Sequence, residues 1–252
     1  IRYEGADPNN YICLDNKTGG TCSDSSLLFR IIGLFDEDTS IDGTSSSGTK
    51  KLLKIIDTNN YGGDDGTNGK KWNSTSYKNN WGISSLKTEL NGTYLDALLS
   101  TSNVNSKLSS AIAITKWHLG GASADNYSIL TAEGFYAEER NTSAIYSGNP
   151  SSIYAKAGLI YPSDYGYATV GGSTKSKSGC SERSLNDWDV SSLSDCKNND
   201  WLFTSQSSFV YSGEWLLSPY SSDSIYAAVL NDDGRVDRNH DSVNNDIAAV
   251  RP

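Results

Sequence analysis

The stretch "SPYSSDSIYAAVLNDDGRVDRNHDSVNNDIAAVRP", residues 218–252, carries the clearest fold signal in the chain. Gly234 follows two aspartates, and a glycine in that position readily supplies the left-handed conformation of a tight hairpin turn. Residues 229–231 and 235–237 are therefore expected to pair as antiparallel strands, with residues 247–250 as a closing strand. Apolar and small residues that suit such a frame recur from residue 215 onward: Trp215, Leu216, Leu217, Pro219, Ala227, Ala228, Val229, Gly234, Val236, Val243, Ala248, Ala249 and Val250.

A second set of residues lies between these frame positions and shows no pattern in size or charge. It mixes aromatic, aliphatic, basic, acidic and small polar side chains, which a frame alone does not require. The members of this set are Tyr220, Asp223, Ser224, Ile225, Tyr226, Asp233, Arg235, Asp237, Arg238, Asn239, His240, Asp241, Asn244, Asn245, Asp246 and Ile247. The segment thus combines a regular scaffold with varied positions.

Five residue types are missing from residues 220–252. The whole chain holds 14 Lys, 8 Glu, 1 Gln, 6 Trp and no Met, so about four such residues would be expected in this segment, and none occurs. Asn codons of the form AAY that change only at their adenines cannot reach any of these types, whereas they do reach Asn, Asp, Tyr, His, Ser, Arg and Ile. The absence favours adenine-directed diversification, and the alternative is a chance omission from a surface loop rich in Ser, Asn and Asp.

No linker rich in Pro, Gly or Ser divides the 252 residues, so one domain is predicted over residues 1–252, with 215–252 as its variable region. Residues 9–36 are expected to form a strand pair joined by a Gly19-Gly20 turn, and 49–57 a third strand. Apolar residues four apart predict a helix over 83–100 that is capped by Ser84 or Ser85. Residues 105–120 are a second candidate helix, although Ile112 and Ile114 also suit a strand. Irregular loops with brief strands are expected beyond residue 125.

The charge of the chain disfavours some classes of partner. A net charge of −9 and a pI of about 4.7 disfavour binding to nucleic acid or to an acidic membrane surface. No apolar run approaches the roughly 18 residues of a membrane helix, so no direct membrane insertion is expected. The chain begins at Ile1 without a signal-like segment, and any anchor is expected to lie outside it.

The four cysteines fall into two local pairs, Cys13 with Cys22 and Cys180 with Cys196. Two local disulfides are the simplest pairing, and they would form only in an oxidising compartment. Residues 172–199 then form a disulfide-closed surface excursion. The alternatives are four reduced thiols or a zinc site, which the absence of a C-x-x-C motif disfavours.

Three other groups of polar residues have structural interpretations that outweigh the functional ones. Asp57, Asp64, Asp65 and Asn68 could hold calcium, but their spacing does not match an EF-hand and favours a solvated acidic loop. The motif "AEGFYAEER" holds Glu133, Glu138 and Glu139, for which pairing of Glu138 or Glu139 with Arg140 or Arg183 is favoured over catalysis. His118 follows Trp117 and is expected to be a hydrogen-bonded core or boundary residue.

Residues 215–252 resemble the variable region of proteins diversified by diversity-generating retroelements. In those proteins the tail runs from a W-L-x-S-P stretch through an N-x-D-G-x-V hairpin to a closing V-R-P, and the same features stand in "WLLSP", "NDDGRV" and "VRP" here. Earlier segments resemble a family of surface proteins of gut Firmicutes: "PNNYICL", "LLFRIIGLFD", "LNGTYLDALLS", "WHLGG", "YAEER", "GLIYPSDYGYATVGGST" and "CKNNDWL".

This resemblance implies an α+β, C-type lectin fold of the kind shared with formylglycine-generating enzymes. Such a fold is irregular, with mostly short antiparallel strands, two helices and long loops, and it displays variable side chains on one exposed face. Catalysis is not expected, because the enzyme branch needs a cysteine pair or copper site near its end and no cysteine follows Cys196. The E-P-N, Q-P-D and W-N-D motifs of calcium-dependent sugar binding are missing as well. No cofactor and no metal is therefore expected.

The sequence predicts a non-catalytic, receptor- or adhesin-like protein that is secreted or displayed on a bacterial or phage-encoded surface. It would bind a protein or glycan on another cell, host or phage through the varied residues. Aromatic, aliphatic and basic members are the expected anchors: Tyr220, Ile225, Tyr226, Arg235, Arg238, His240 and Ile247. The alternatives are a structural surface or pilus subunit, and a secreted glycan-active hydrolase that uses Glu138 or Glu139 with Asp232 or Asp233.

Overall fold

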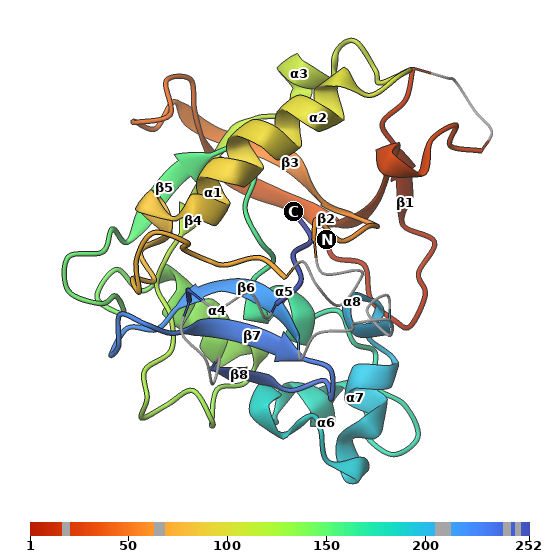
Figure 1. The fold of residues 1–252 in the computed structure, drawn as a ribbon. Helices are drawn as coiled ribbons and strands as arrows, with labels where there is room; N and C mark the ends of the chain where they lie inside the picture. The colour runs from red at the N-terminus through yellow and green to blue at the C-terminus, as the bar shows by residue number, and fades with distance from the viewer. Residues whose placement is uncertain (17–20, 63–68, 205–212, 239–242, 245–247) are drawn as a thin grey trace.

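Two antiparallel sheets and a series of short helices make up the structure (Figure 1). It is a computed structural model that describes residues 1–16, 21–62, 69–204, 213–238, 243–244 and 248–252. The strands are β1 (Tyr11–Cys13), β2 (Leu28–Ser40), β3 (Gly48–Asp57), β4 (Ile114–His118), β5 (Ser152–Ala155), β6 (Gly213–Pro219), β7 (Ala227–Asn231) and β8 (Val236–Arg238). The α-helices are α1 (Ser85–Glu89), α2 (Leu95–Ser100), α3 (Leu108–Ala111), α4 (Ala132–Arg140), α5 (Pro162–Gly166), α6 (Lys177–Ser181), α7 (Ser194–Asn198) and α8 (Trp201–Thr204). A π-helical segment (Leu90–Tyr94) joins α1 to α2, and 3-10 turns occupy Ser25–Leu27, Trp81–Ile83, Leu185–Asp187 and Ser191–Leu193.

The α+β class with antiparallel sheets is confirmed. The first sheet has the order β1-β2-β4-β5, and β3 pairs with β2 from Phe29–Asp57 to Thr39–Gly48. The strand pair expected over residues 9–36 is β1 with β2, and the third strand is β3. The Gly19-Gly20 turn lies outside the described residues. β2 is the longest strand, and all the other elements of this sheet are placed by it directly or through β4.

The helix predicted over residues 83–100 is present and crosses the first sheet (Figure 1). Ser84 caps it, since its side chain accepts a hydrogen bond from the backbone N–H of Lys87. Leu86, Leu90 and Leu98, spaced for one helical face, are at most 7% exposed. Gly92 does not break the helix, because the chain passes it in the π-helical segment.

The prediction of a second helix over residues 105–120 is mostly wrong. Only α3 is helical, and the chain then enters β4, as the alternative interpretation of Ile114 suggested. β4 pairs with β5 from Thr115–Ala155 to His118–Ser152. β-Branched residues such as Ile114 and Thr115 lose little side-chain freedom in a strand. The backbone N–H and C=O groups that would bond within a helix are instead paired with those of β5.

Helix α4 was not predicted, because residues beyond 125 were expected to be irregular. Thr131 caps α4 by accepting a hydrogen bond from the Gly134 N–H. Its buried side carries Ala132, Phe135 and the acidic residue Glu139. A carboxylate on the buried side interrupts the apolar pattern from which a helix is recognised in sequence. Helices are therefore more numerous than the two that were expected.

The second sheet, β6-β7-β8, contains the predicted hairpin. Leu230 pairs with Val236 across the turn, and Gly234 has φ 93°, the left-handed conformation that its position after two aspartates indicated. Of the closing strand expected over 247–250, Ile247 lies outside the described residues. Ala248 and Ala249 form isolated bridges with Lys70 and Glu214 instead of a continuous ladder.

Two hydrophobic clusters form the core. One lies between the first sheet, the α1–α2 helix and one side of β6 and β7, and it includes Trp72, Trp81 and Trp215. The ring of Trp72 lies 4.7 Å from that of Trp81 and 5.8 Å from that of Trp215. The other cluster packs α4 to α8 against the second sheet. Among the described residues, no helix is both long and apolar enough to cross a bilayer.

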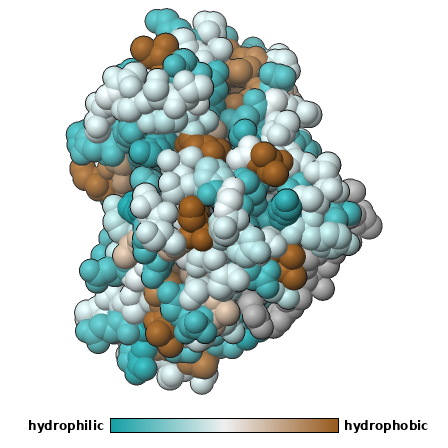
Figure 2. Space-filling model, turned by 90° about the vertical axis from the view of Figure 1, so that its left-hand side faces the viewer, coloured by the Kyte–Doolittle hydropathy of each residue, from teal (hydrophilic) through white to brown (hydrophobic). Residues whose placement is uncertain are grey.

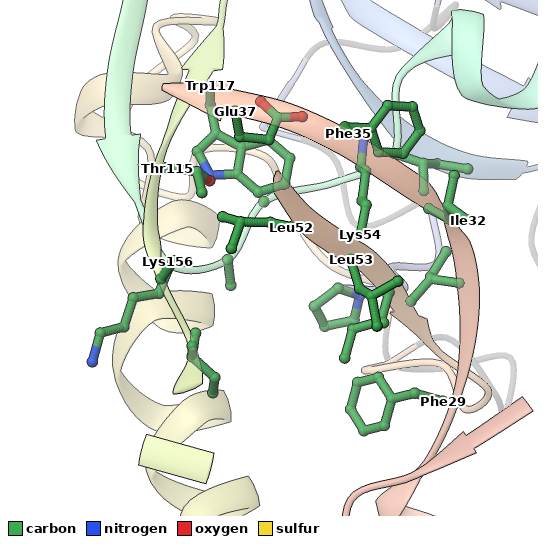
Figure 3. Close-up of a pocket in the computed structure, with 18 of the residues that line it drawn as sticks. Phe29, Ile32, Phe35, Glu37, Leu52, Leu53, Lys54, Thr115, Trp117 and Lys156 are labelled. Carbon is green, nitrogen blue, oxygen red and sulfur yellow. The ribbon is translucent and has the colours of Figure 1, made fainter. Parts of the chain in front are cut away.

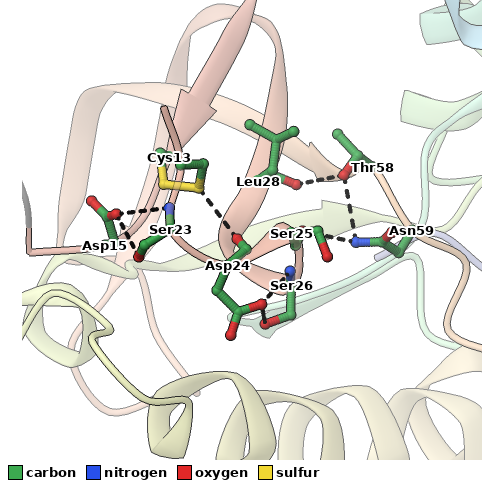
Figure 4. Close-up of a disulfide and its surroundings, with 10 residues drawn as sticks. Cys13, Asp15, Ser23, Asp24, Ser25, Ser26, Leu28, Thr58 and Asn59 are labelled. Atoms are coloured by element: carbon green, nitrogen blue, oxygen red, sulfur yellow. Dashed lines mark hydrogen bonds between the residues drawn. A yellow bond between two sulfur atoms is a disulfide. The ribbon is translucent and has the colours of Figure 1, made fainter. Parts of the chain in front are cut away.

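Both predicted disulfides are present, Cys13–Cys22 and Cys180–Cys196, each with Cα atoms 5.5 Å apart. Hydrogen bonds from Ser23 to Asp15 and from Ser26 to Asp24 surround the first (Figure 4). Cys180 and Cys196 are fully buried in the second cluster, so the segment 172–199 contributes to the core and is not only a surface excursion. Two disulfides indicate an oxidising environment.

Candidate functional site

The frame of the candidate site is the second sheet. Every residue of β6 is buried, and β7 is buried from Ala227 to Leu230. Leu216 and Leu230 enter one hydrophobic cluster, while Trp215, Leu217 and Val229 enter the other. Since alternate side chains of a strand point to opposite faces, both faces of this sheet are covered. In β6 and β7 the partly exposed side chains therefore lie at the ends of the strands and in the connections between them.

The loop over residues 220–226, between β6 and β7, is held by Asn79. This asparagine is fully buried, and its Nδ2 lies within hydrogen-bond distance of the carbonyl oxygens of Tyr220 (2.9 Å), Asp223 (2.9 Å) and Tyr226 (2.7 Å). Its backbone N–H donates to the Ser224 carbonyl. The Asn79 Oδ1 accepts a hydrogen bond from Asn149 Nδ2. One side chain thus fixes the path of the whole loop.

A second segment, residues 121–126, holds the other side of the loop. The Ser221 N–H donates to the Ala122 carbonyl at 2.9 Å, and the Ala124 N–H donates to Ser222 Oγ at 2.8 Å. Gly121 lies so close that a Cβ there would come within 2.0 Å of the Pro219 carbonyl oxygen. Only glycine permits this approach, so residue 121 sets how closely the two segments pack.

A pocket of about 320 Å³ opens beside Ser224. Its other walls come from the segment after Tyr77 and from the segment before β5. These walls are Lys78, Asn80, Ile83, Tyr146, Ser147, Gly148 and Asn149. The loop 220–226 lies on the left of Figure 1, the side that faces the viewer in Figure 2. On that face hydrophobic side chains are scattered among hydrophilic ones (Figure 2).

A second group of predicted site residues lies in the turn between β7 and β8. Arg235 Nε is 3.2 Å from Asp233 Oδ2 and 4.0 Å from Asp237 Oδ2. The Gly234 carbonyl accepts a hydrogen bond from Tyr165 Oη at 2.7 Å, which fixes this turn to the core. The turn and the loop 220–226 lie at opposite ends of β7, whose five residues span roughly 17 Å. The described site residues therefore form two separate groups.

Two of the predicted site residues were expected to be exposed but are buried. Tyr220 is 2% exposed and Asp237 7% exposed. The Tyr220 ring packs between Tyr127 at 5.8 Å and Tyr226 at 6.4 Å, so it supports the loop from beneath. Partly exposed positions are occupied by Asp223, Ser224, Ile225, Tyr226, Asp233, Arg235 and Asn244. Asn239, His240, Asp241, Asn245, Asp246 and Ile247 lie outside the described residues, and only the backbone of Arg238 is described.

Sequence reasoning missed the residues that hold and extend the loop. Asn79 and Tyr146 belong to segments that are far from the tail in sequence, and neither carries a recognisable motif. The one available signal was the run of polar residues around Asn79 in an otherwise aromatic segment, "SYKNNW". Its partners are 141 to 147 residues away, so the pattern could not show what it contacts.

The carboxylates of α4 differ in burial. Glu139 is fully buried and pairs with Arg140 at 3.1 Å, as predicted. It also accepts hydrogen bonds from the backbone N–H and Oγ of Ser163, at 2.9 and 2.6 Å. Burial raises the pKa of Glu139 to about 7, outweighing the hydrogen bonds from Ser163 and the nearby Arg140 charge. Since it has no solvent-facing oxygen, Glu139 serves to join α4 to α5.

The raised pKa of Glu139 predicts a pH-dependent stability. The stability associated with protonated Glu139 is complete below its ordinary pKa of 4.5 and is lost as the pH rises through about 7. Glu139→Gln keeps a neutral, similarly shaped side chain. Relative to the wild type, this variant should gain on the order of 3 kcal/mol between pH 4.5 and pH 8. Urea unfolding at several pH values measures the gain, and Glu133→Gln, on the exposed side of α4, is the control. A constant difference across this range would contradict the prediction.

His118 and Asp57 make structural contacts. His118 is half-buried, and its backbone N–H and carbonyl bond to Tyr161 Oη at 2.8 and 3.1 Å, consistent with a boundary residue. Burial, followed by Arg140 and Lys116, lowers the pKa of His118 to about 4. Asp57 is buried and accepts a hydrogen bond from Tyr94 Oη, while Asp64, Asp65 and Asn68 lie outside the described residues. Among the described residues, Cys13, Asp15 and Cys22 form a group with metal-ligand spacing, but both sulfurs are already joined in a disulfide.

Comparisons with protein-family models, with curated proteins and with solved structures gave no match to this chain.

Proposed function

We propose that the chain is a non-catalytic binding protein, secreted or displayed on a bacterial or phage-encoded surface, whose loop 220–226 and adjoining pocket contact a ligand. One observation carries this proposal: a half-exposed loop of varied side chains is fixed at four backbone positions by the buried Asn79. A loop ordered in advance loses little conformational entropy on binding, which favours affinity.

We further propose a C-type lectin fold for the domain and diversification of residues 215–252 by a retroelement. The diversification proposal is supported by burial, which separates the residues of this segment into a buried group and a partly exposed group. In the described part, frame residues such as Trp215, Ala227 and Val250 are fully buried, whereas Ser224, Ile225 and Tyr226 are partly exposed. Substitution at the second kind of position leaves the core unchanged, which a diversified protein requires.

The walls of the pocket beside Ser224 favour a glycan over a flat protein surface. Tyr146 offers an aromatic ring, and Asn80 and Lys78 offer amide and ammonium groups around a concave space. Small-molecule and sugar sites combine an apolar or aromatic wall with a few polar groups that fix orientation. Ser224 and its neighbours in the loop would then select among glycans.

The proposal is tested by glycan-array binding of the 252-residue chain and of two alanine variants. Tyr226→Ala removes an aromatic side chain from the loop, and Arg235→Ala removes a side chain at the other end of β7. Loss of an interface anchor is worth about 2 kcal/mol, or roughly 30-fold in affinity. We expect that loss for Tyr226→Ala and near-wild-type binding for Arg235→Ala. Absence of any bound glycan, or undiminished binding by Tyr226→Ala, would exclude the loop as a glycan site.

Diversification is tested separately by sequencing the codons for residues 215–252 across the source population. The flanking DNA should hold a near-identical template and a reverse transcriptase gene. Substitutions confined to template adenines and falling on positions such as Ser224 and Tyr226 are the expected result. A uniform tail without a template would leave a domain with one fixed partner and would favour the structural-subunit alternative.

A further inference from the structure

A groove separate from the loop 220–226 runs between β3 and the α1–α2 helix. It has a volume of about 460 Å³, within the range of small-molecule sites. Its apolar part is lined by Leu14, Phe29, Leu52, Leu95, Leu98 and Leu108. Figure 3 shows Leu52 projecting into this space, with Phe29 and Leu53 along one side and Lys156 on the other.

The groove is lined by residues that lie far apart along β2. Phe29 and Glu37 both line it, and they are separated by eight residues of β2, or roughly 25 Å of strand. A ligand with an extended chain could contact both ends of this lining. Phe29 lies at the apolar end, whereas Glu37 lies at the end with Trp117 (Figure 3).

The charges around the groove oppose those of the whole protein. The chain has a net charge of −9, yet the basic residues that line the groove outnumber the acidic ones. The basic residues are Arg2, Lys51, Lys54, Lys116, Arg140 and Lys156, and the acidic ones are Glu37 and Asp164.

The ion pairs of these residues leave positive charge available at the groove. Arg2 and Lys54 share the buried Asp164, so two positive charges face one negative charge. Arg140 pairs with the buried Glu139. The Lys51–Asp36 pair is largely solvated, whereas the Lys116–Asp38 pair is 3.6 Å long and has side chains that are 33% and 28% exposed. In the part of the chain that the structure describes, Lys156 is exposed and makes no ion pair.

Glu37 lies at the same end of the groove as the Lys54 and Arg140 side chains. Its carboxyl group is half-buried, and burial raises its pKa, although the Lys54 and Arg140 charges lower it. The basic side chains at this end of the groove are the groups that would contact an acidic head group.

We propose that this groove binds a single-chain amphiphile with an anionic head, of the fatty-acid class, at a site independent of the loop 220–226. The chain would lie along β2 among the leucines, where each buried methylene adds to affinity. The head would lie at the end with Arg140, Lys54 and Lys116. This site does not depend on the function proposed for the tail, so either can fail without the other.

The test is calorimetric titration of the 252-residue chain with dodecanoate below its micelle concentration. We expect saturable binding with one site, at least tenfold tighter than that of octanoate, because four methylenes are lost. Dodecanol and dodecyltrimethylammonium should bind at least fivefold more weakly than dodecanoate. Quenching of tryptophan fluorescence gives a second readout, since Trp117 lines the groove.

Three variants locate the site. Leu52→Glu places a carboxylate in the apolar part and should weaken dodecanoate binding at least tenfold. Lys156→Glu should weaken it several-fold, whereas the same charge change at Lys175, outside the groove, should leave it unchanged. Circular dichroism of each variant shows whether it is folded. Leu52 is partly exposed and Lys156 exposed, so neither change removes a core contact.

Several results would overturn the proposal. These are no saturable binding of dodecanoate by the folded protein, equal affinities for octanoate and dodecanoate, or wild-type affinity in Leu52→Glu. Equal binding of dodecyltrimethylammonium would exclude the anionic head, as would equal effects of Lys156→Glu and Lys175→Glu.

Discussion

Replacing Arg251 with alanine is expected to lower the free energy of unfolding by about 3–5 kcal/mol. Arg251 is 2% exposed and pairs with the fully buried Glu214, with Nε 3.1 Å from Oε1 and Nη2 3.2 Å from Oε2. It also donates to the Leu202 carbonyl at 3.0 Å. Removing the guanidinium leaves the Glu214 charge buried without its partner, which costs more than the pair itself contributes. Urea unfolding measures the loss.

The control for this variant is Lys51→Ala. Lys51 pairs with Asp36 at 3.0 Å, but the two side chains are 59% and 65% exposed, so the loss should stay below about 1 kcal/mol. The double variant Glu214→Leu/Arg251→Met replaces the pair by apolar side chains and should recover most of the stability. Equal losses for Arg251→Ala and Lys51→Ala would show that burial does not set the strength of the first pair.

Removing the Cys180–Cys196 disulfide by replacing both residues with alanine is expected to cost about 3 kcal/mol or more. Most of this loss comes from the unfolded chain, which gains conformational entropy when the link between residues 16 positions apart is removed. Both cysteines are fully buried in the second core cluster, so the smaller alanines also leave space that the core must close.

The matched comparison is the Cys13→Ala/Cys22→Ala variant. That disulfide spans nine residues and is only partly buried, so the loss should be smaller. Thermal unfolding of both variants measures the difference. In the native protein, dithiothreitol should reduce Cys13–Cys22 first, because its sulfurs are the more accessible. Faster reduction of Cys180–Cys196 would contradict the burial argument.

Local signals in the sequence predicted local structure well. The Asp-Asp-Gly turn gave the β7–β8 hairpin, and Ser84 with the leucines after it gave the α1–α2 helix, because capping and periodicity depend on neighbouring residues only. Helix α4 was missed because Glu139 occupies a buried position, where its partner Ser163 is distant in sequence.

The candidate site depended on contacts that no local pattern contains. Tyr220 and Tyr226 are the same residue type in one loop, yet Tyr220 is buried by Tyr127, and only the fold brings that ring to it. Asn79 and the pocket walls around Tyr146 reach the loop from segments far away along the chain. The sequence therefore predicted which segment carries the candidate site, but not which of its side chains face solvent.

The length of β7 has an evolutionary consequence. Substitutions whose sites are more than about 10 Å apart and share no partner usually combine additively in stability. Asn79 holds the loop 220–226, while Tyr165 holds the turn at residue 234, so the two ends have different supports. A change that harms one end leaves the tolerance of the other intact. Each end can accordingly accept new side chains independently of the other. Tolerated substitutions at the two ends can then be combined without compensating changes elsewhere.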